Sequence, residues 1–154
     1  MSGQIIVDLT ERSSTPKATL GQYHIDNLGR HWQYVKASAA IAVSEYVKVS
    51  GDGLYAISSM TTTTNPSTEP ANVGCAQTAY ASGDYGYVFR GFGVHTGLFA
   101  ASCVQNVKIY TTATGGVVDD AATTLVNGLK LITTITSAAA APAFASGLLT
   151  TAAA

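Results

Sequence analysis

The sequence predicts an all-β fold, a small barrel or sandwich with an extended N-terminal arm and little helix. Short runs of alternating and β-branched residues recur at close spacing between glycine-containing turns, which is typical of small barrels and sandwiches. No long stretch repeats its apolar residues with the period of a helix. The 154 residues suffice for one domain. We divide them into an arm over residues 1–19, a β-rich core over 20–136 and an Ala/Thr-rich tail over 137–154.

The arm is expected to be extended. Its apolar run is Ile5, Ile6 and Val7, and the segment Ser13–Pro16 favours no regular structure. We expect the arm to become ordered when it lies on another surface, where the apolar run could add a strand to an exposed sheet edge. These three residues are therefore candidate interface residues. No basic residue precedes the run, so we do not expect a signal peptide.

The first half of the core is expected to contain three strands, because large apolar residues alternate with smaller or polar ones. They are Trp32–Ala37, Tyr46–Val49 and Leu54–Ser58. A turn over 50–53 would join the last two strands, since its sequence Ser-Gly-Asp-Gly is rich in turn residues. The polar segment 61–72 is expected to be a surface loop.

Residues 73–93 favour a β-hairpin. Two uncharged, alternating runs flank the turn Ser82-Gly83-Asp84, and glycine and aspartate tolerate the backbone of tight turns. On the second run Tyr85, Tyr87 and Phe89 would share one face. We expect this aromatic row to pack across the hairpin or against a partner surface.

The rest of the chain predicts strands at Val107–Tyr110 and Leu129–Thr136. Between them, Asp119-Asp120 could cap one helical turn over Ala121–Leu125. Residues 131–154 carry no charge, but their Ala, Thr and Ser content and Pro142 make a poor membrane span. We expect this segment to dock on its own subunit or on a neighbouring one.

Candidate catalytic and metal-binding residues are few, and an enzyme is not expected. Cys75 and Cys103 favour buried thiols, although a disulfide between them is possible. His24, His31 and His95 lack the spacing of a metal motif. No serine nucleophile motif or phosphate-binding loop is present, so no cofactor and no metal are expected.

Composition indicates a neutral domain that assembles with partners. Charged residues make up 11% of the chain, against about 25% in an ordinary soluble protein. A surface with so few charges is more stable when partners cover it, which favours a homo-oligomer. The net charge of −1 argues against general nucleic-acid binding, because that binding needs a basic patch.

Three segments carry a resemblance. They are LGQYHIDNLGRHWQYVKASAAIAVSEYVKV over 20–49, VGCAQTAYASGDYGYVFRGFG over 73–93 and, less closely, VVDDAA and VNGL within 117–129. Taken together along residues 20–135, they are similar to the capsid decoration (head-stabilising, or cement) proteins of tailed bacteriophages. Tyr87 stands where a Trp is commoner in that family, and the long Ala/Thr-rich tail is a second departure.

The resemblance implies a structural protein of the virion, made in the host cytoplasm. It would sit as a homotrimer on the outer surface of the capsid, bound to the major capsid protein, and would stabilise the expanded head. No nucleic acid and no membrane would be bound. The interface candidates are Ile5, Ile6, Val7, Trp32, Tyr85, Tyr87 and Phe89.

Two other functions stay open. Sugars stack on aromatic rings, so Trp32, Tyr85 and Tyr87 could instead serve a virion-borne module that binds carbohydrate or a cell surface. A tail-tube or adaptor subunit would also be β-rich and neutral. An image of the particle would separate the capsid from the tail.

Overall fold

The computed structural model describes residues 7–62, 71–121 and 123–152, and in these residues the chain is all-β with no helix, as predicted. No helix that could cross a membrane is therefore found in this part of the chain. Its strands are β1 (Arg12–Ser13), β2 (Tyr23–Ile25), β3 (His31–Ala37), β4 (Tyr46–Val49), β5 (Ala56–Ser59), β6 (Asn72–Cys75), β7 (Tyr85–Phe99), β8 (Ile109–Thr111), β9 (Val118–Asp119), β10 (Leu125–Leu131) and β11 (Ala139–Thr151).

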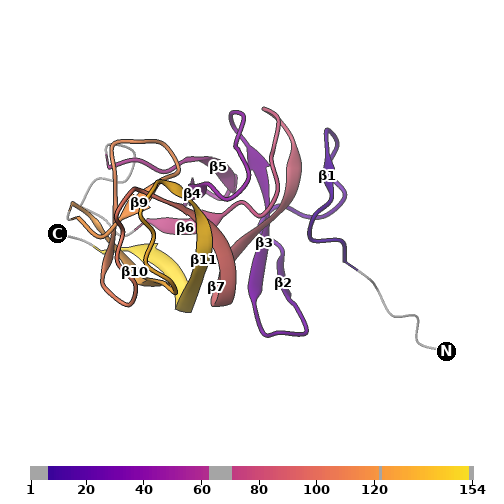
Figure 1. The fold of residues 1–154 in the computed structure, drawn as a ribbon. Helices are drawn as coiled ribbons and strands as arrows, with labels where there is room; N and C mark the ends of the chain where they lie inside the picture. Colours follow the sequence, from indigo (N-terminus) through magenta and orange to yellow (C-terminus); the bar gives the residue numbers. More distant parts are fainter. Residues whose placement is uncertain (1–6, 63–70, 122, 153–154) are drawn as a thin grey trace.

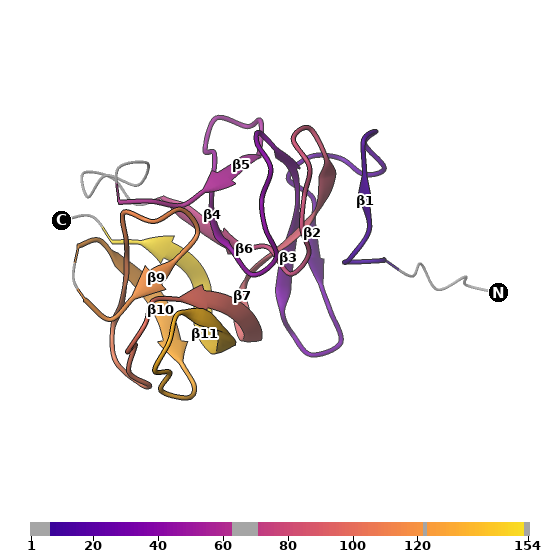
Figure 2. The same cartoon turned by 45° about the horizontal axis from the view of Figure 1, so that its top comes forward.

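The strand pairings close two circuits that share β7 (Figures 1 and 2). The first barrel runs through β3, β5, β4, β6 and β7, and its pairs are antiparallel except for β3 with β5. The second barrel runs through β7, β9, β8, β10 and β11, and only β7 with β9 is parallel. The fold thus consists of two small barrels joined along one long strand.

β7 changes partners near Gly91. Its first half pairs with β3 and its second half pairs with β11, and both ladders are irregular at this point. Gly91 has a φ of 152°, and a Cβ placed there would overlap the carbonyl oxygen of Gly147. Only glycine therefore lets β11 approach β7 closely enough for the chain to pass from one barrel to the other.

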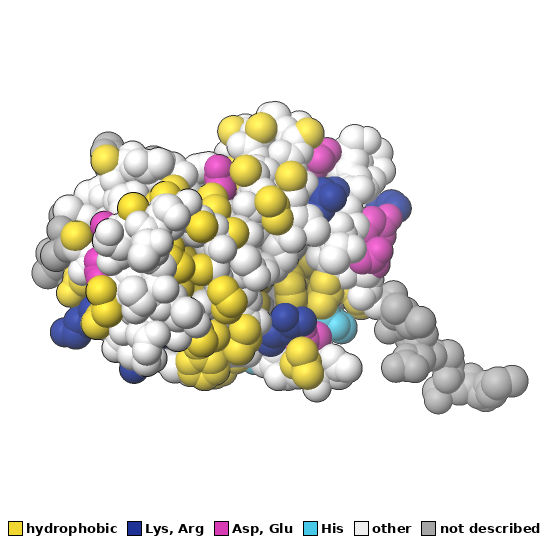
Figure 3. Space-filling view, viewed as in Figure 1, with side chains coloured by type: hydrophobic (Ala, Val, Ile, Leu, Met, Phe, Trp, Pro, Cys, Tyr) yellow, Lys and Arg dark blue, Asp and Glu magenta, His cyan; other side chains and the backbone are white. Residues whose placement is uncertain are grey.

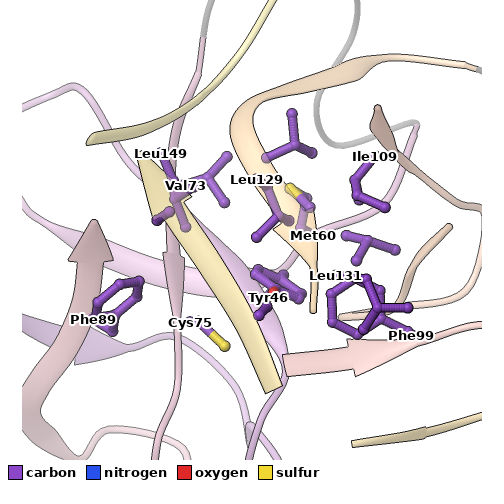
Figure 4. Packing of buried hydrophobic residues seen from close by; sticks show 14 of the residues in the cluster. Tyr46, Met60, Val73, Cys75, Phe89, Phe99, Ile109, Leu129, Leu131 and Leu149 are labelled. Atoms are coloured by element: carbon purple, nitrogen blue, oxygen red, sulfur yellow. The ribbon is translucent and has the colours of Figure 1, made fainter. Parts of the chain in front are cut away.

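Buried apolar residues form two clusters, one for each barrel. The smaller cluster fills the first barrel with side chains from β3, β4, β5 and β7 and from the adjoining loops: Val35, Ala37, Ile41, Val47, Val49, Ile57, Ala76, Tyr80 and Val88. The larger cluster fills the second barrel and extends over the outer face of the first barrel, where it includes Trp32, Tyr34 and Tyr87. Figure 4 shows part of this cluster, with Tyr46 between Phe99 and Leu131 on one side and Cys75 and Phe89 on the other.

The predicted tail is a central strand. Residues 139–151 form β11, which pairs with β7, β10 and β6. Ala141, Ala143 and Ala145 point into the second barrel, whereas Pro142 and Phe144 point outward. The segment therefore docks on its own subunit, but as a strand and not as a tail after a last strand at Leu129–Thr136. Alternation between alanine and larger residues is a weak signal of a strand.

The predicted hairpin over 73–93 is also corrected. The turn is present, since Asp84 accepts a hydrogen bond from the Ala81 amide at 2.9 Å and donates its own amide to the Ala81 carbonyl. However, β6 and β7 share only the residue pair Cys75 and Phe89. The first half of β7 pairs instead with β3 over six residue pairs. Tyr80, which precedes the turn, forms a β-bridge with Ile41 and is therefore not paired with the second run of the predicted hairpin.

The remaining strands depart from prediction in smaller ways. β4 has the predicted bounds, whereas β5 begins at Ala56 because Asp52 caps the preceding turn by accepting the Leu54 amide at 3.0 Å. Asp119 and Asp120 do not cap a helical turn: the first lies in β9, and the second accepts the Val104 amide at 2.9 Å. Of the predicted loop 61–72, residues 63–70 lie outside the described part of the chain.

The described part of the arm lies against the chain's own first barrel. β1 pairs with the start of β7, and Val7, Leu9 and Ala18 pack against the larger cluster. Ile5 and Ile6 lie outside the residues that the structure describes. From Val7 onward the arm therefore has a surface within its own subunit.

Candidate interaction surface

The outer face of β7 and β11 carries an apolar strip. Val94 and Phe144 are directly opposite each other across the two strands, and Leu148 is opposite Gly91. The strip consists of Phe92, Val94, Phe144 and Leu148, which are 41%, 51%, 44% and 40% exposed. In Figure 3, hydrophobic side chains gather over β7 and β11 in the lower centre of the view. We call these four residues the β7–β11 strip.

The strip follows from the alternation of side chains in a half-covered sheet. On β7, His95 and Phe99 point into the second barrel, so Val94 and Thr96 point outward. The sequence does not indicate the strip, because the segment around Phe144 has the composition of an Ala/Thr-rich tail. The pattern Ala-Pro-Ala-Phe-Ala over 141–145, with small residues at every second position, was the available signal.

Charged groups border the strip without entering it. Lys130 on β10 is exposed and is opposite Phe144. On the other side, Arg30 donates from Nη1 to the Val94 carbonyl at 3.3 Å and from Nε to Asp26 at 2.8 Å. An apolar centre with a polar rim is the usual arrangement of a protein interface.

The turn between β2 and β3 adds exposed apolar residues beside Arg30. Ile25 at the end of β2 and Leu28 in the turn are both exposed, and Asp26 organises the turn. Asp26 accepts the amides of Leu28 and Arg30 through Oδ1, and the indole Nε1 of Trp32 through Oδ2 at 3.0 Å. Burial alone would raise the pKa of Asp26, but these hydrogen bonds outweigh it and lower the pKa.

Most of the aromatic residues that were predicted to form an interface are buried in the core. Trp32, Tyr87 and Phe89 are only 4%, 7% and 0% exposed, and Tyr85 is half-buried. Phe89 meets Trp32 edge-on, with ring centroids 5.9 Å apart. The aromatic row was expected to pack across the hairpin or against a partner surface. In the structure it packs within the chain, against residues of β3 and not across a hairpin. Val7, the described member of the apolar run in the arm, is half-buried.

Neither cysteine has the character of a nucleophile. Both are buried and neither is in a disulfide. Burial raises the pKa of the Cys75 thiol strongly and that of Cys103 to about 11, so both are protonated at neutral pH. Cys103 lies near Asp119 and Asp120, with one possible ligand atom of each within 4.8 Å of the others. Both carboxylates already accept hydrogen bonds from the backbone, however. Asp120 accepts the Val104 amide, and Asp119 accepts the Asp120 amide at 2.8 Å.

His95 is a core residue. Its Nε2 is 2.8 Å from the Tyr46 hydroxyl, and its ring stacks on Phe89 with centroids 4.2 Å apart. Burial lowers the pKa of His95 to about 4, so the ring is neutral at physiological pH. His24 and His31 lie on β2 and β3, where their rings contact Tyr87 and Phe92 respectively.

Comparison with known proteins identifies no relative of this chain. No protein-family model, curated protein or solved structure matches the sequence. The function is therefore inferred from the residues and the geometry of the chain itself.

Proposed function

We propose that the chain is a structural protein of a bacteriophage virion, which binds the outer surface of the capsid lattice as a homotrimer and stabilises the expanded head. The resemblance of residues 20–49, 73–93 and 117–129 to capsid decoration proteins supports this function. The low charge of the chain supports an assembling protein in general.

The observation that carries the proposal is the β7–β11 strip. Four apolar side chains that are 40–51% exposed on one sheet face are costly to leave in water. Full burial of such a side chain is worth about 1.5–3 kcal/mol, so covering the exposed part of each is worth about half of that. A capsid subunit with a matching apolar face is the proposed occupant. Lys130 and Arg30 at the rim would meet carboxylates on that subunit.

Multivalent attachment makes this contact strong. One strip alone would give a weak complex, because association also costs translational and rotational freedom. Three strips on one trimer would convert the second and third contacts into intramolecular events. A trimer that touches several capsomers would resist their separation when packaged DNA pushes the shell outward.

Binding to purified expanded heads of the virus that encodes this chain tests the function. We expect the protein to sediment with the heads and to saturate them. Phe144→Asp should lower the affinity at least tenfold, because it removes apolar contact worth about 1 kcal/mol and also buries an unpaired charge. Val107→Asp is the matched control: Val107 is also exposed but is not part of the strip, so binding should not change.

The same experiment has outcomes that contradict the proposal. Wild-type protein that stays in the supernatant with saturating heads would exclude capsid decoration. Electron microscopy that finds the protein on the tail would favour the tail-tube or adaptor function. Light scattering that gives a monomer both free and eluted from heads would exclude the trimer.

A further inference from the structure

A pocket of about 350 Å³ lies between the N-terminal segment and the strands β3 and β7. Three tyrosines, Tyr34, Tyr85 and Tyr87, line it together with polar side chains that include Asp8 and Gln22. The volume is within the range of about 300–1,000 Å³ that is usual for small-molecule sites. We propose that this pocket binds a neutral sugar ring. This would be a binding activity separate from attachment to the capsid.

The wall of the pocket is fixed at both ends. At one end, β1 pairs with the start of β7, and Gly86 permits this approach because a Cβ there would lie 2.9 Å from the Glu11 carbonyl oxygen. At the other end, Tyr34 holds the segment twice. Its hydroxyl accepts the Lys17 amide at 2.9 Å, and its carbonyl accepts the Gly21 amide at 2.8 Å. The pocket is therefore a built feature of the first barrel.

The tyrosines give the pocket an aromatic side. The rings of Tyr34 and Tyr87 meet at 62° with centroids 5.1 Å apart, and Tyr85 lies nearly parallel to Tyr34 at 6.4 Å. Tyr85 is half-buried, so part of its ring faces the pocket. Tyr34 and Tyr87 are only 4% and 7% exposed and form the back of the pocket, so the apolar C–H face of a pyranose would pack on the ring of Tyr85.

The polar side of the pocket suits hydroxyl groups. Hydrogen bonds from Thr10 lower the pKa of Asp8, so its carboxylate is ionised at neutral pH. Its Oδ1 accepts both bonds from Thr10, and the exposed carboxylate would accept a further bond from a sugar hydroxyl. Gln22 is exposed and offers both a donor and an acceptor.

The charges around the pocket favour a neutral ligand over a charged one. Asp8 and Glu11 carry two negative charges, and Lys17 carries one positive charge that pairs with Glu11. The resulting negative balance would repel sialic and uronic acids. A cationic ligand would meet the ammonium group of Lys17, which lines the pocket. A neutral saccharide avoids both conflicts.

Saturation-transfer NMR and calorimetry on the full chain test this inference. The probes are glucose, galactose, mannose, N-acetylglucosamine and short oligosaccharides of each. We expect saturable binding of at least one of them. Tyr85→Ala should weaken it about tenfold, since a lost aromatic contact is worth about 1.5 kcal/mol. Asp8→Asn, an exposed substitution that leaves the fold intact, should also weaken it.

Tyr110→Ala is the matched control, because Tyr110 is half-buried like Tyr85 but lies on β8 in the second barrel. It should leave sugar binding unchanged. Three outcomes would overturn the inference: no neutral sugar binds, Tyr85→Ala and Asp8→Asn bind as wild type, or sialyllactose or tetramethylammonium binds more tightly than every neutral sugar. The Phe144→Asp variant should keep sugar binding, so failure of the capsid proposal and failure of this one give different results.

Discussion

The two halves of β7 differ in how they are covered. Residues 86–91 are buried on both faces, because one face lines the first barrel and the other is covered by the larger cluster and the N-terminal segment. From Phe92 to Phe99, buried and exposed residues alternate, and only the face toward the second barrel is covered. One strand thus serves as a core element in its first half and as an outer surface in its second. Phe92 and Val94 continue the face on which Val88 lines the first barrel, so the surface begins where β7 leaves that barrel.

Two phenylalanines on β7 provide the sharpest test of this difference. Phe89 is fully buried, and Phe92, three residues on, is exposed. Phe89→Ala should lower the free energy of unfolding by about 3–5 kcal/mol, because it leaves a cavity among packed aromatic rings. Phe92→Ala should lower it by about 1 kcal/mol or less, because the ring is 41% exposed and loses mainly its contact with His31. Urea unfolding measures both. Equal effects would mean that the two halves of β7 are covered alike.

The alanines of β11 test the other side of the comparison. Ala143 is fully buried in the second barrel, whereas Ala140 is exposed on the same strand. Ala143→Leu should cost about 1–3 kcal/mol through overpacking, and Ala140→Leu should cost about 0.5 kcal/mol or less. Thermal unfolding of the two variants gives this contrast. A stable Ala143→Leu variant would show that the second barrel has unfilled space.

His95 makes the buried face of the second half of β7 sensitive to acid. Its pKa is about 4 in the folded chain and about 6.5 in the unfolded chain, so between these values the unfolded state binds more protons. The stability from this group is complete above pH 6.5 and is lost as the pH falls toward 4. At pH 5 the loss should be about 2 kcal/mol.

The control for this pH effect is His95→Gln. The free energy of unfolding of wild type should fall more between pH 7 and pH 5 than that of the variant, by about 2 kcal/mol. The comparison uses the change with pH, so the lost hydrogen bond to Tyr46 cancels. Parallel pH profiles would show that His95 is accessible to water in the folded chain.

The sequence indicated the strands whose alternation involves large side chains. β3 and β4 were predicted nearly to the residue, because Trp32, Tyr34 and Val47 make the period of two visible. The strand β11 was missed because its inward residues are alanines, which are common in every kind of structure. The sequence also did not indicate which strands pair with each other. Nothing in residues 85–91 themselves shows that their neighbour is β3 and not β6.

The sequence predicted that the chain would have an apolar interaction surface, but not which residues form it. Low charge indicated that some apolar face would be covered by a partner. Alternation correctly places Tyr87 and Phe89 on one face, but it does not say which face is covered within the chain, and these side chains and Trp32 are in the core. Phe144 and Val94 become neighbours only through the pairing of β7 with β11, a contact between segments some 50 residues apart that sequence pattern does not reveal.

The position of β11 in the chain has a consequence for synthesis. It follows the other strands in sequence, and 40 residues separate the end of β7 at Phe99 from Ala139. At about 5–20 residues per second, the ribosome needs about 2–8 s to make them. During that time the second half of β7 cannot pair with β11. The apolar faces of the nascent chain are then exposed and can contact other chains. Chaperones that bind nascent chains would act on this protein in that interval.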